Sequence, residues 1–193
     1  MAWELQLLSP LGVHLATVTQ ATSPNPVMGS VEAVVDAGGR TNQLTARVRQ
    51  DLIQAVPRGI LRYSVDSVPI AAGVIVTSPV LTSPGSGPAD READALDRIT
   101  AVGLEQLLQD SIIGPRMFTT DTDVATIALE LCQLYSHPAL IVDPSNFPLA
   151  GYSLGVFYSP EKTLYAALDQ LAETVPGGLN WFVNPDREIL FNA

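Results

Sequence analysis

The spacing of apolar residues changes once along this chain, and this change constrains the fold more than any other feature. From Met1 to about Phe118, apolar residues alternate with polar ones in short runs, as in half-buried β-strands. From Thr119 onward they recur every three to four residues, as on the buried face of a helix. The sequence therefore predicts an α+β fold, with a mainly-β small barrel over residues 1–118 and a small α+β domain over residues 119–193.

Short runs with strand character fill the first part of the chain. Trp3, Leu5 and Leu7 alternate with polar residues, for example, and the turn Ser9–Gly12 follows them. The runs expected to form strands are 3–7, 13–18, 31–35, 44–49, 60–65, 70–76 and 98–102. Strands of this length, at this spacing, are typical of a small barrel or sandwich.

Three further segments interrupt or follow these strands. Asp51–Val56 is expected to form one helical turn that Pro57 ends. Ser78–Pro88 is rich in serine, proline and glycine, which is typical of an exposed loop. Gly103–Leu108 is expected to form a brief helix.

The second part contains two predicted helices. Thr120 and Asp123 have the spacing of a capping box, and Pro138 ends the first helix. The second helix begins at Ser159, an N-cap followed by proline, and ends at Pro176. The apolar stripes consist of Val124, Ile127, Ala128, Leu131 and Leu134 on the first helix, and Leu164, Ala167, Leu168 and Leu171 on the second.

A predicted hairpin closes the chain, with strands at Leu179–Val183 and Glu188–Phe191. An isolated two-stranded hairpin is marginally stable in water. We therefore expect the stripe of the second helix to be buried against Trp181 and Phe191.

The charge and the apolar content of the chain exclude several classes of function. Twenty acidic residues against ten basic ones give a formal net charge of −10. Binding to a phosphate backbone depends on Lys and Arg, so specific nucleic-acid binding is not expected. The longest apolar run, Pro69–Val76, is far shorter than the roughly 20 residues of a membrane-spanning helix, and the N-terminus carries no pattern of a secretion signal.

One motif matches an enzyme signature. Gly151–Gly155 fits the G-x-S-x-G elbow of serine hydrolases, with Ser153 in the place of the nucleophile. That elbow needs a helix directly after the serine and a histidine later in the chain. Here Val156–Tyr158 has the pattern of extended chain, and both histidines, His14 and His137, precede the serine. We therefore interpret the motif as a turn without catalytic partners, with a serine-type hydrolase as the alternative.

The other chemically reactive residues also have structural explanations. Asp121 and Asp123 stand where negative charge stabilises a helix N-terminus, and Cys132 is expected to be a small buried residue. One cysteine and two scattered histidines cannot form a closed zinc site. An acidic group before residue 98 lacks the pattern of a calcium loop. This group consists of Asp90, Glu92, Asp94 and Asp97. We predict no enzymatic activity, no catalytic residues, no cofactor and no metal.

The order of elements carries a resemblance to a known family. Its segments are Gly59–Asp66, Val68–Ile75, Arg98–Leu108 with the run Gly-Leu-Glu-x-Leu-Leu, Asp123–Ala128, Tyr158–Ala172, Leu179–Val183 and Ile189–Phe191. In this order and in these apolar and glycine positions, most of the chain resembles the baseplate hub and minor tail proteins of siphophages.

This resemblance implies a structural role at the tip of a virion tail, in particles assembled in the host cytoplasm. Such hubs form a ring, of three or six copies here, that continues the tail tube. They contact the distal tail protein, the tape-measure protein and other tail-tip proteins, and DNA leaves through the lumen. An acidic inner wall, built from the residues before Phe118, would repel phosphate and let DNA slide. The loop Ser78–Pro88 should then lie away from the lumen or at a subunit contact.

The resemblance also implies a difference from a full hub. A full hub has two related barrels per chain, and only one is expected here, so a second chain or additional copies would complete the ring. A generic β-rich protein-binding module without a role in the virion is the remaining alternative.

Overall fold

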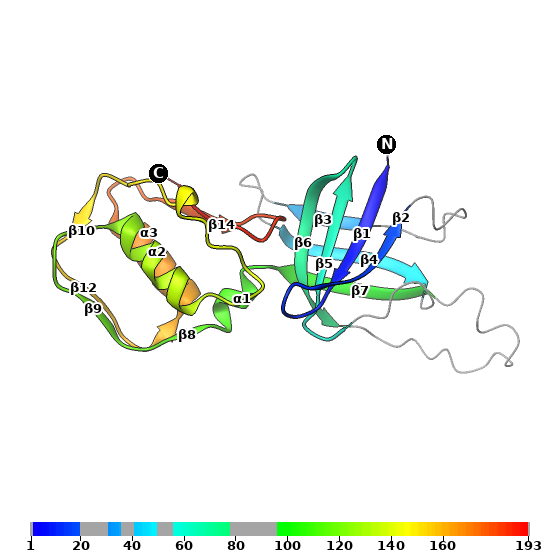
Figure 1. The fold of residues 1–193 in the computed structure, drawn as a ribbon, viewed down its shortest axis with the longest axis horizontal. Coiled ribbons are helices and arrows are strands. Elements are labelled where there is room, and N and C mark those ends of the chain that lie inside the picture. The colour runs from blue at the N-terminus through cyan, green and yellow to red at the C-terminus, as the bar shows by residue number, and fades with distance from the viewer. Residues whose placement is uncertain (1, 20–30, 36–40, 50–55, 78–95, 193) are drawn as a thin grey trace, which may run out of the picture. The chain divides into compact units, whose positions relative to one another are not determined.

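The computed structural model describes residues 2–19, 31–35, 41–49, 56–77 and 96–192, and its fold is α+β, as predicted (Figure 1). Contacts divide the chain into two compact units, Met1–Gly103 and Leu104–Ala193. Apart from Val56, the helical turn expected at Asp51–Val56 lies outside the described residues, and so does the loop expected at Ser78–Pro88.

The described strands of the first unit form one antiparallel sheet of seven strands, in the order β2-β1-β5-β6-β7-β4-β3. They are β1 (Trp3–Leu8), β2 (His14–Thr19), β3 (Val31–Val35), β4 (Thr41–Arg49), β5 (Ile60–Val65), β6 (Val68–Thr77) and β7 (Leu96–Gly103). Every strand expected in this part is present, because alternating apolar residues can be buried together only when the backbone is extended.

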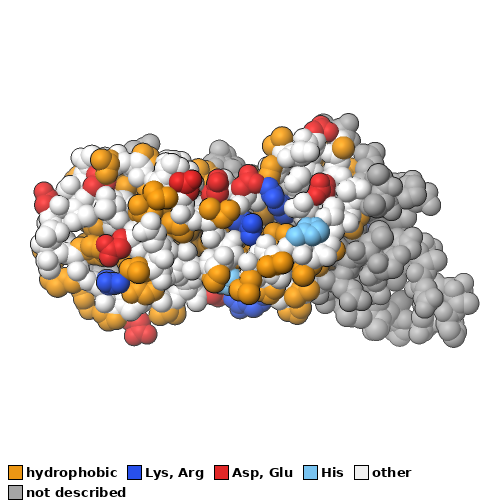
Figure 2. All heavy atoms as spheres, in the orientation of Figure 1, with side chains coloured by type: hydrophobic (Ala, Val, Ile, Leu, Met, Phe, Trp, Pro, Cys, Tyr) orange, Lys and Arg blue, Asp and Glu red, His pale blue; other side chains and the backbone are white. Residues whose placement is uncertain are grey.

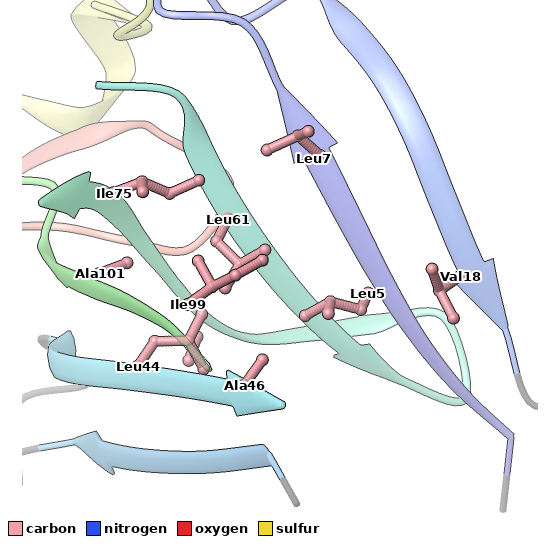
Figure 3. Close-up of a cluster of buried hydrophobic side chains, with 10 residues drawn as sticks. Leu5, Leu7, Val18, Leu44, Ala46, Leu61, Ile75, Ile99 and Ala101 are labelled. Carbon is pink, nitrogen blue, oxygen red and sulfur yellow. The ribbon is translucent and has the colours of Figure 1, made fainter. Parts of the chain in front are cut away.

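The inward faces of these strands share one apolar core. Its members are Leu5, Leu7, Val18, Leu44, Ala46, Leu61, Ala71, Ile75, Ile99 and Ala101. Although β1 and β4 lie near opposite ends of the strand order, side chains from both belong to this cluster (Figure 3). The sheet therefore curls around its core.

Two backbone features fix the register of this sheet. Asp66 and Ser67 both have positive φ angles, 49° and 67°, which is the geometry of the two-residue turn that matches strand twist. On β6, a Cβ atom at Gly73 would lie 2.3 Å from the carbonyl oxygen of Val102 on β7. Only glycine permits this close approach of the two strands.

A two-stranded ribbon runs through the second unit and was not predicted from the sequence. One side consists of β8 (Ile112–Ile113), β9 (Arg116–Phe118) and β10 (Thr122–Asp123), and the other of β11 (Ser153–Leu154), β12 (Phe157–Ser159) and β13 (Lys162–Thr163). The pairs are β8 with β13, β9 with β12, and β10 with β11, all antiparallel. Strands this short show too few alternations to be recognised from periodicity.

The ribbon sets where the two long helices begin, and two predicted caps are wrong for this reason. α2 (Val124–Tyr135) is capped by Asp123, whose carboxylate accepts a hydrogen bond from the Ala125 amide at 2.9 Å, and not by Thr120. α3 (Leu164–Thr174) is capped by Thr163. Ser159, the predicted cap, is paired within β12 instead. Each helix can start only where strand pairing stops.

The helices also end before the predicted prolines, and one member of the first stripe is wrong. α2 is followed by Ser136 as its C-cap, and α3 by Val175. Leu134 is 52% exposed, so it does not belong to the buried face that Leu131 and Cys132 continue. The other predicted stripe residues of both helices are buried.

The C-terminal hairpin, β14 (Asn180–Val183) and β15 (Ile189–Asn192), packs on α3 as predicted. The indole of Trp181 donates a hydrogen bond to the Asp169 carboxylate at 2.8 Å and meets the Tyr165 ring edge-on, with centroids 4.9 Å apart. On the other strand, Phe191 stacks with Phe147, which follows the short helix η1 (Pro144–Asn146).

Residues 104–118 pack within the second unit, whereas the change in periodicity placed the domain boundary after Phe118. The short helix α1 (Gln106–Gln109) contacts α3, and Glu105 accepts a hydrogen bond from the Val183 amide at 3.1 Å. β8 and β9 pair with strands that come later in the chain. β8 and β9 are extended, like the strands of the first unit, but the strands with which they pair belong to the second unit.

Candidate functional site

Ser153 lies in the two-stranded ribbon and not at a nucleophile elbow. Ser153 is exposed in β11, directly opposite Asp123 in β10. A second strand, β12, follows it where the elbow of a serine hydrolase has a helix. Within the described residues, no hydrogen bond joins its hydroxyl to a histidine: His137 accepts from the Ala139 amide, and His14 bonds to Thr17 in the first unit.

The loop that contains this motif is anchored to the start of α2 by Asp123. One carboxylate oxygen of Asp123 accepts from the amides of Ala125 and Ala150, at 2.9 and 3.1 Å. The other oxygen accepts from the Gly151 amide at 2.9 Å. Gly151 has a φ of 67°, a conformation that favours glycine. Gly151 is therefore explained by the local backbone: its positive φ angle lets its amide donate a hydrogen bond to Asp123, the N-cap of α2.

Cys132 lies on the buried face of α2, with none of its surface exposed. Burial raises the pKa of its thiol to about 12, because the charged thiolate would lose its hydration. Since the thiolate is the reactive form, this side chain acts as a small apolar residue of the core.

The remaining candidates form no metal site in the part of the chain that the structure describes. There, no three His, Cys, Asp or Glu side chains come together in a way that could hold an ion. Asp90, Glu92 and Asp94 lie outside the described residues, as does the side chain of Asp97. No described helix is both long enough and apolar enough to span a membrane.

The two units differ strongly in charge. Residues 104–193 contain eleven acidic and three basic side chains, a formal charge of −8, whereas residues 1–103 contain nine and seven, a formal charge of −2. Acidic side chains are scattered over the second unit in Figure 2. This division could not be read from the total charge, because it depends on where the boundary lies.

Exposed apolar side chains mark several strands and turns of the described surface. On β3, Val34 and Val35 are 49% and 38% exposed. In the second unit, Met117 and Tyr158 form an exposed cross-strand pair between β9 and β12. Together with the edge strands, these residues offer surfaces for contact with protein.

Comparisons with known proteins identify a shared fold. No family model matches the chain, and no curated protein matches it. A tail protein from Neisseria meningitidis MC58 has a similar structure, with a TM-score of 0.55 and 12% identity, over 98% of this chain and 50% of that one. A 43 kDa tail protein of prophage MuSo2 from Shewanella oneidensis gives a TM-score of 0.48 at 8% identity, over 99% of this chain and 49% of that one. The chain thus spans about half the length of each, and over nearly all of its own length it shares the fold of the Neisseria tail protein.

Proposed function

We propose that this chain is a structural, non-enzymatic component of a bacteriophage tail. The observation that carries the proposal is the likeness in fold to the Neisseria tail protein, which extends over 98% of this chain and includes both units. A fold shared at 12% identity does not by itself imply a shared function. Here it agrees with the order of elements in the sequence, which independently resembles that of tail proteins.

The finer role that we infer is that of a hub-like minor tail protein at the tail tip. In this role several copies form a ring that continues the tail tube and contacts the distal tail and tape-measure proteins. The sheet of the first unit suits such an assembly, because β2 and β3 stand at the two ends of its strand order. Strands in that position present backbone groups that a neighbouring subunit can cover.

The absence of catalysis in this proposal rests on what Ser153 and Asp123 do. Asp123 is engaged by three backbone amides, and Ser153 is part of the ribbon that positions that carboxylate. Both are accounted for by the local fold. We expect Ser153→Ala to leave assembly unchanged and to alter the free energy of unfolding by less than about 0.5 kcal/mol. Labelling of Ser153 by a fluorophosphonate probe would contradict the non-enzymatic role.

The proposal is tested on purified virus particles. Mass spectrometry should find the chain in intact tails, in three or six copies per particle, and electron cryomicroscopy should place its density at the tip. A chain that is absent from purified particles would disprove the proposed role. Density along the whole tube would contradict the assignment to the tip.

A further inference from the structure

Two arginines face each other on the outer surface of the first unit. Arg47 on β4 is the direct cross-strand partner of Arg98 on β7. Leu44, Ala46 and Ile99 point into the core, so strand alternation turns both arginines outward, and both are exposed. Cβ atoms of residues paired in this way are about 4.5–5.5 Å apart. The sheet thus holds two positive charges side by side.

Nothing in the described part of the chain neutralises this pair. Neither guanidinium forms a hydrogen bond or an ion pair there. The next outward pair along the two strands is Thr45 with Thr100, which carries no charge. Glu32 lies opposite Thr45, diagonal to Arg47, and within the described residues no ion pair joins the two. Like charges directly opposite each other destabilise a sheet, so the arrangement is unfavourable for an isolated subunit.

The arginine pair lies close to an edge of the sheet, because β4 is the neighbour of the last strand, β3. β3 is the last strand in the order and pairs with β4, and it exposes Val34 and Val35. Exposed β-branched residues on an edge strand are a template for association. Val34 lies opposite Gln43, four residues along β4 from Arg47, and Glu32 lies between them in the register. Protein–protein interfaces are enriched in arginine and depleted of lysine, so the arginine pair is the part of this face that suits an interface.

We propose that this outer face of β3, β4 and β7 binds the acidic second unit of another copy of the same chain. The partner is argued from charge: every copy carries a formal charge of −8 on residues 104–193, and this arginine pair is a cationic feature that can attract it. Two copies of a chain with a net charge of −10 otherwise repel each other. The inference rests on the proposed ring, because it names the contact that would join its subunits.

The test uses the purified full-length chain and a single substitution, Arg98→Glu. This change places a carboxylate opposite Arg47. It removes the repulsion between the two arginines within the sheet, and it also removes their attraction for an acidic partner. In sedimentation velocity at low salt, we expect the wild type to self-associate and the variant to have a dissociation constant raised about tenfold or more. The melting temperature of the monomer, measured at a dilution where both proteins are dissociated, should stay equal or rise.

Controls separate charge from shape and from other ligands. Arg47→Lys/Arg98→Lys keeps both charges and should retain self-association. In 1 M salt, where the screening length falls to about 3 Å, wild-type association should weaken. Equal association of the wild type and Arg98→Glu overturns the inference, as does a lower monomer melting temperature for the variant. Binding of a DNA duplex that depends on the arginines, with self-association unchanged, would overturn it in favour of a nucleic-acid contact. None of these results bears on whether the chain is present in tails, which the particle experiment decides.

Discussion

A single carboxylate organises the start of the main helix of the second unit. Asp123 lies at the end of a strand, caps α2 and holds two amides of a loop that returns from residue 150. Hydrogen bonds to a charged acceptor are stronger than neutral ones, and all three donors would lose their partner together. The residue that resembled part of a helix signal in the sequence is therefore also a link between distant segments.

Removal of this carboxylate should destabilise the second unit. We expect Asp123→Ala to lower the free energy of unfolding by about 2 kcal/mol, because a helix cap is lost and three backbone amides, two of them partly buried, lose their acceptor. Urea denaturation measures the change. The matched control is Asp143→Ala, since Asp143 caps the short helix η1 through the Ser145 amide alone and is fully exposed. A loss no greater than that of the control would contradict the linking role.

The buried thiol of Cys132 predicts a specific dependence on alkaline pH. Its folded-state pKa of about 12 lies above the ordinary value of 9.0, because burial disfavours the thiolate. The stabilisation is therefore complete below pH 9 and is lost as the pH rises from about 9 to about 12. Equilibrium unfolding over this range should show a smaller decline for Cys132→Ala than for the wild type. Rapid reaction of the native thiol with a disulfide reagent at pH 8 would contradict its burial.

At the scale of elements, the second unit is held together by α3 and the hairpin it supports. Leu164, Leu168 and Leu171 are fully buried, and Trp181 is fixed to the same helix by Asp169 and Tyr165. The ribbon is attached in a similar way, because Arg116 on β9 donates a hydrogen bond to the Tyr135 hydroxyl at the end of α2. The helices thus serve as the support for strands that are too short to be stable alone.

Two leucines on different helices provide a direct test of this packing. Leu168→Ala should lower the free energy of unfolding by about 2–5 kcal/mol, because it opens a cavity in a core that is closed to solvent. Leu134→Ala makes the same chemical change at a site that is 52% exposed and should cost less than about 0.5 kcal/mol. Thermal or urea unfolding distinguishes the two. Similar losses at both positions would show that α3 does not support the core as described.

The elements differ in how far the sequence could predict them. The strands of the first unit and the stripe of α3 were predictable because each repeats its pattern over several residues, as Leu5 and Leu7 or Leu164 and Leu168 do. The ribbon was not, since its pairs join residues about 30 to 50 positions apart through strands of two or three residues. The helix cap predicted at Ser159 is wrong for the same reason, because Ser159 is paired with Arg116 in the ribbon. The residues after Ser153 are extended, as expected, but Ser153 itself lies in the strand β11 and not in the predicted turn.

At the scale of the whole molecule, the chain is divided in charge as well as in fold. The first unit is close to neutral and carries the outward arginine pair, whereas the second unit is strongly acidic. The acidic inner wall predicted from the residues before Phe118 stays a prediction about the proposed ring. The distribution of charge indicates that the second unit is the main source of any negative potential. In the proposed ring, contact between two second units is therefore disfavoured by repulsion.

The strand order of the first unit has a consequence for how the chain is synthesised. β1 pairs with β5, and β4 pairs with β7. Trp3 can therefore pair only after Val65 has left the ribosome, and Leu44 only after Ala101 has done so. Until then the hairpin of β1 and β2 exposes apolar residues that have no sheet to cover them. Sheets built from such distant pairings form slowly and are vulnerable to aggregation while incomplete. Slow translation and low temperature should therefore favour recovery of the folded protein, and chaperone binding is expected to act on the nascent first unit.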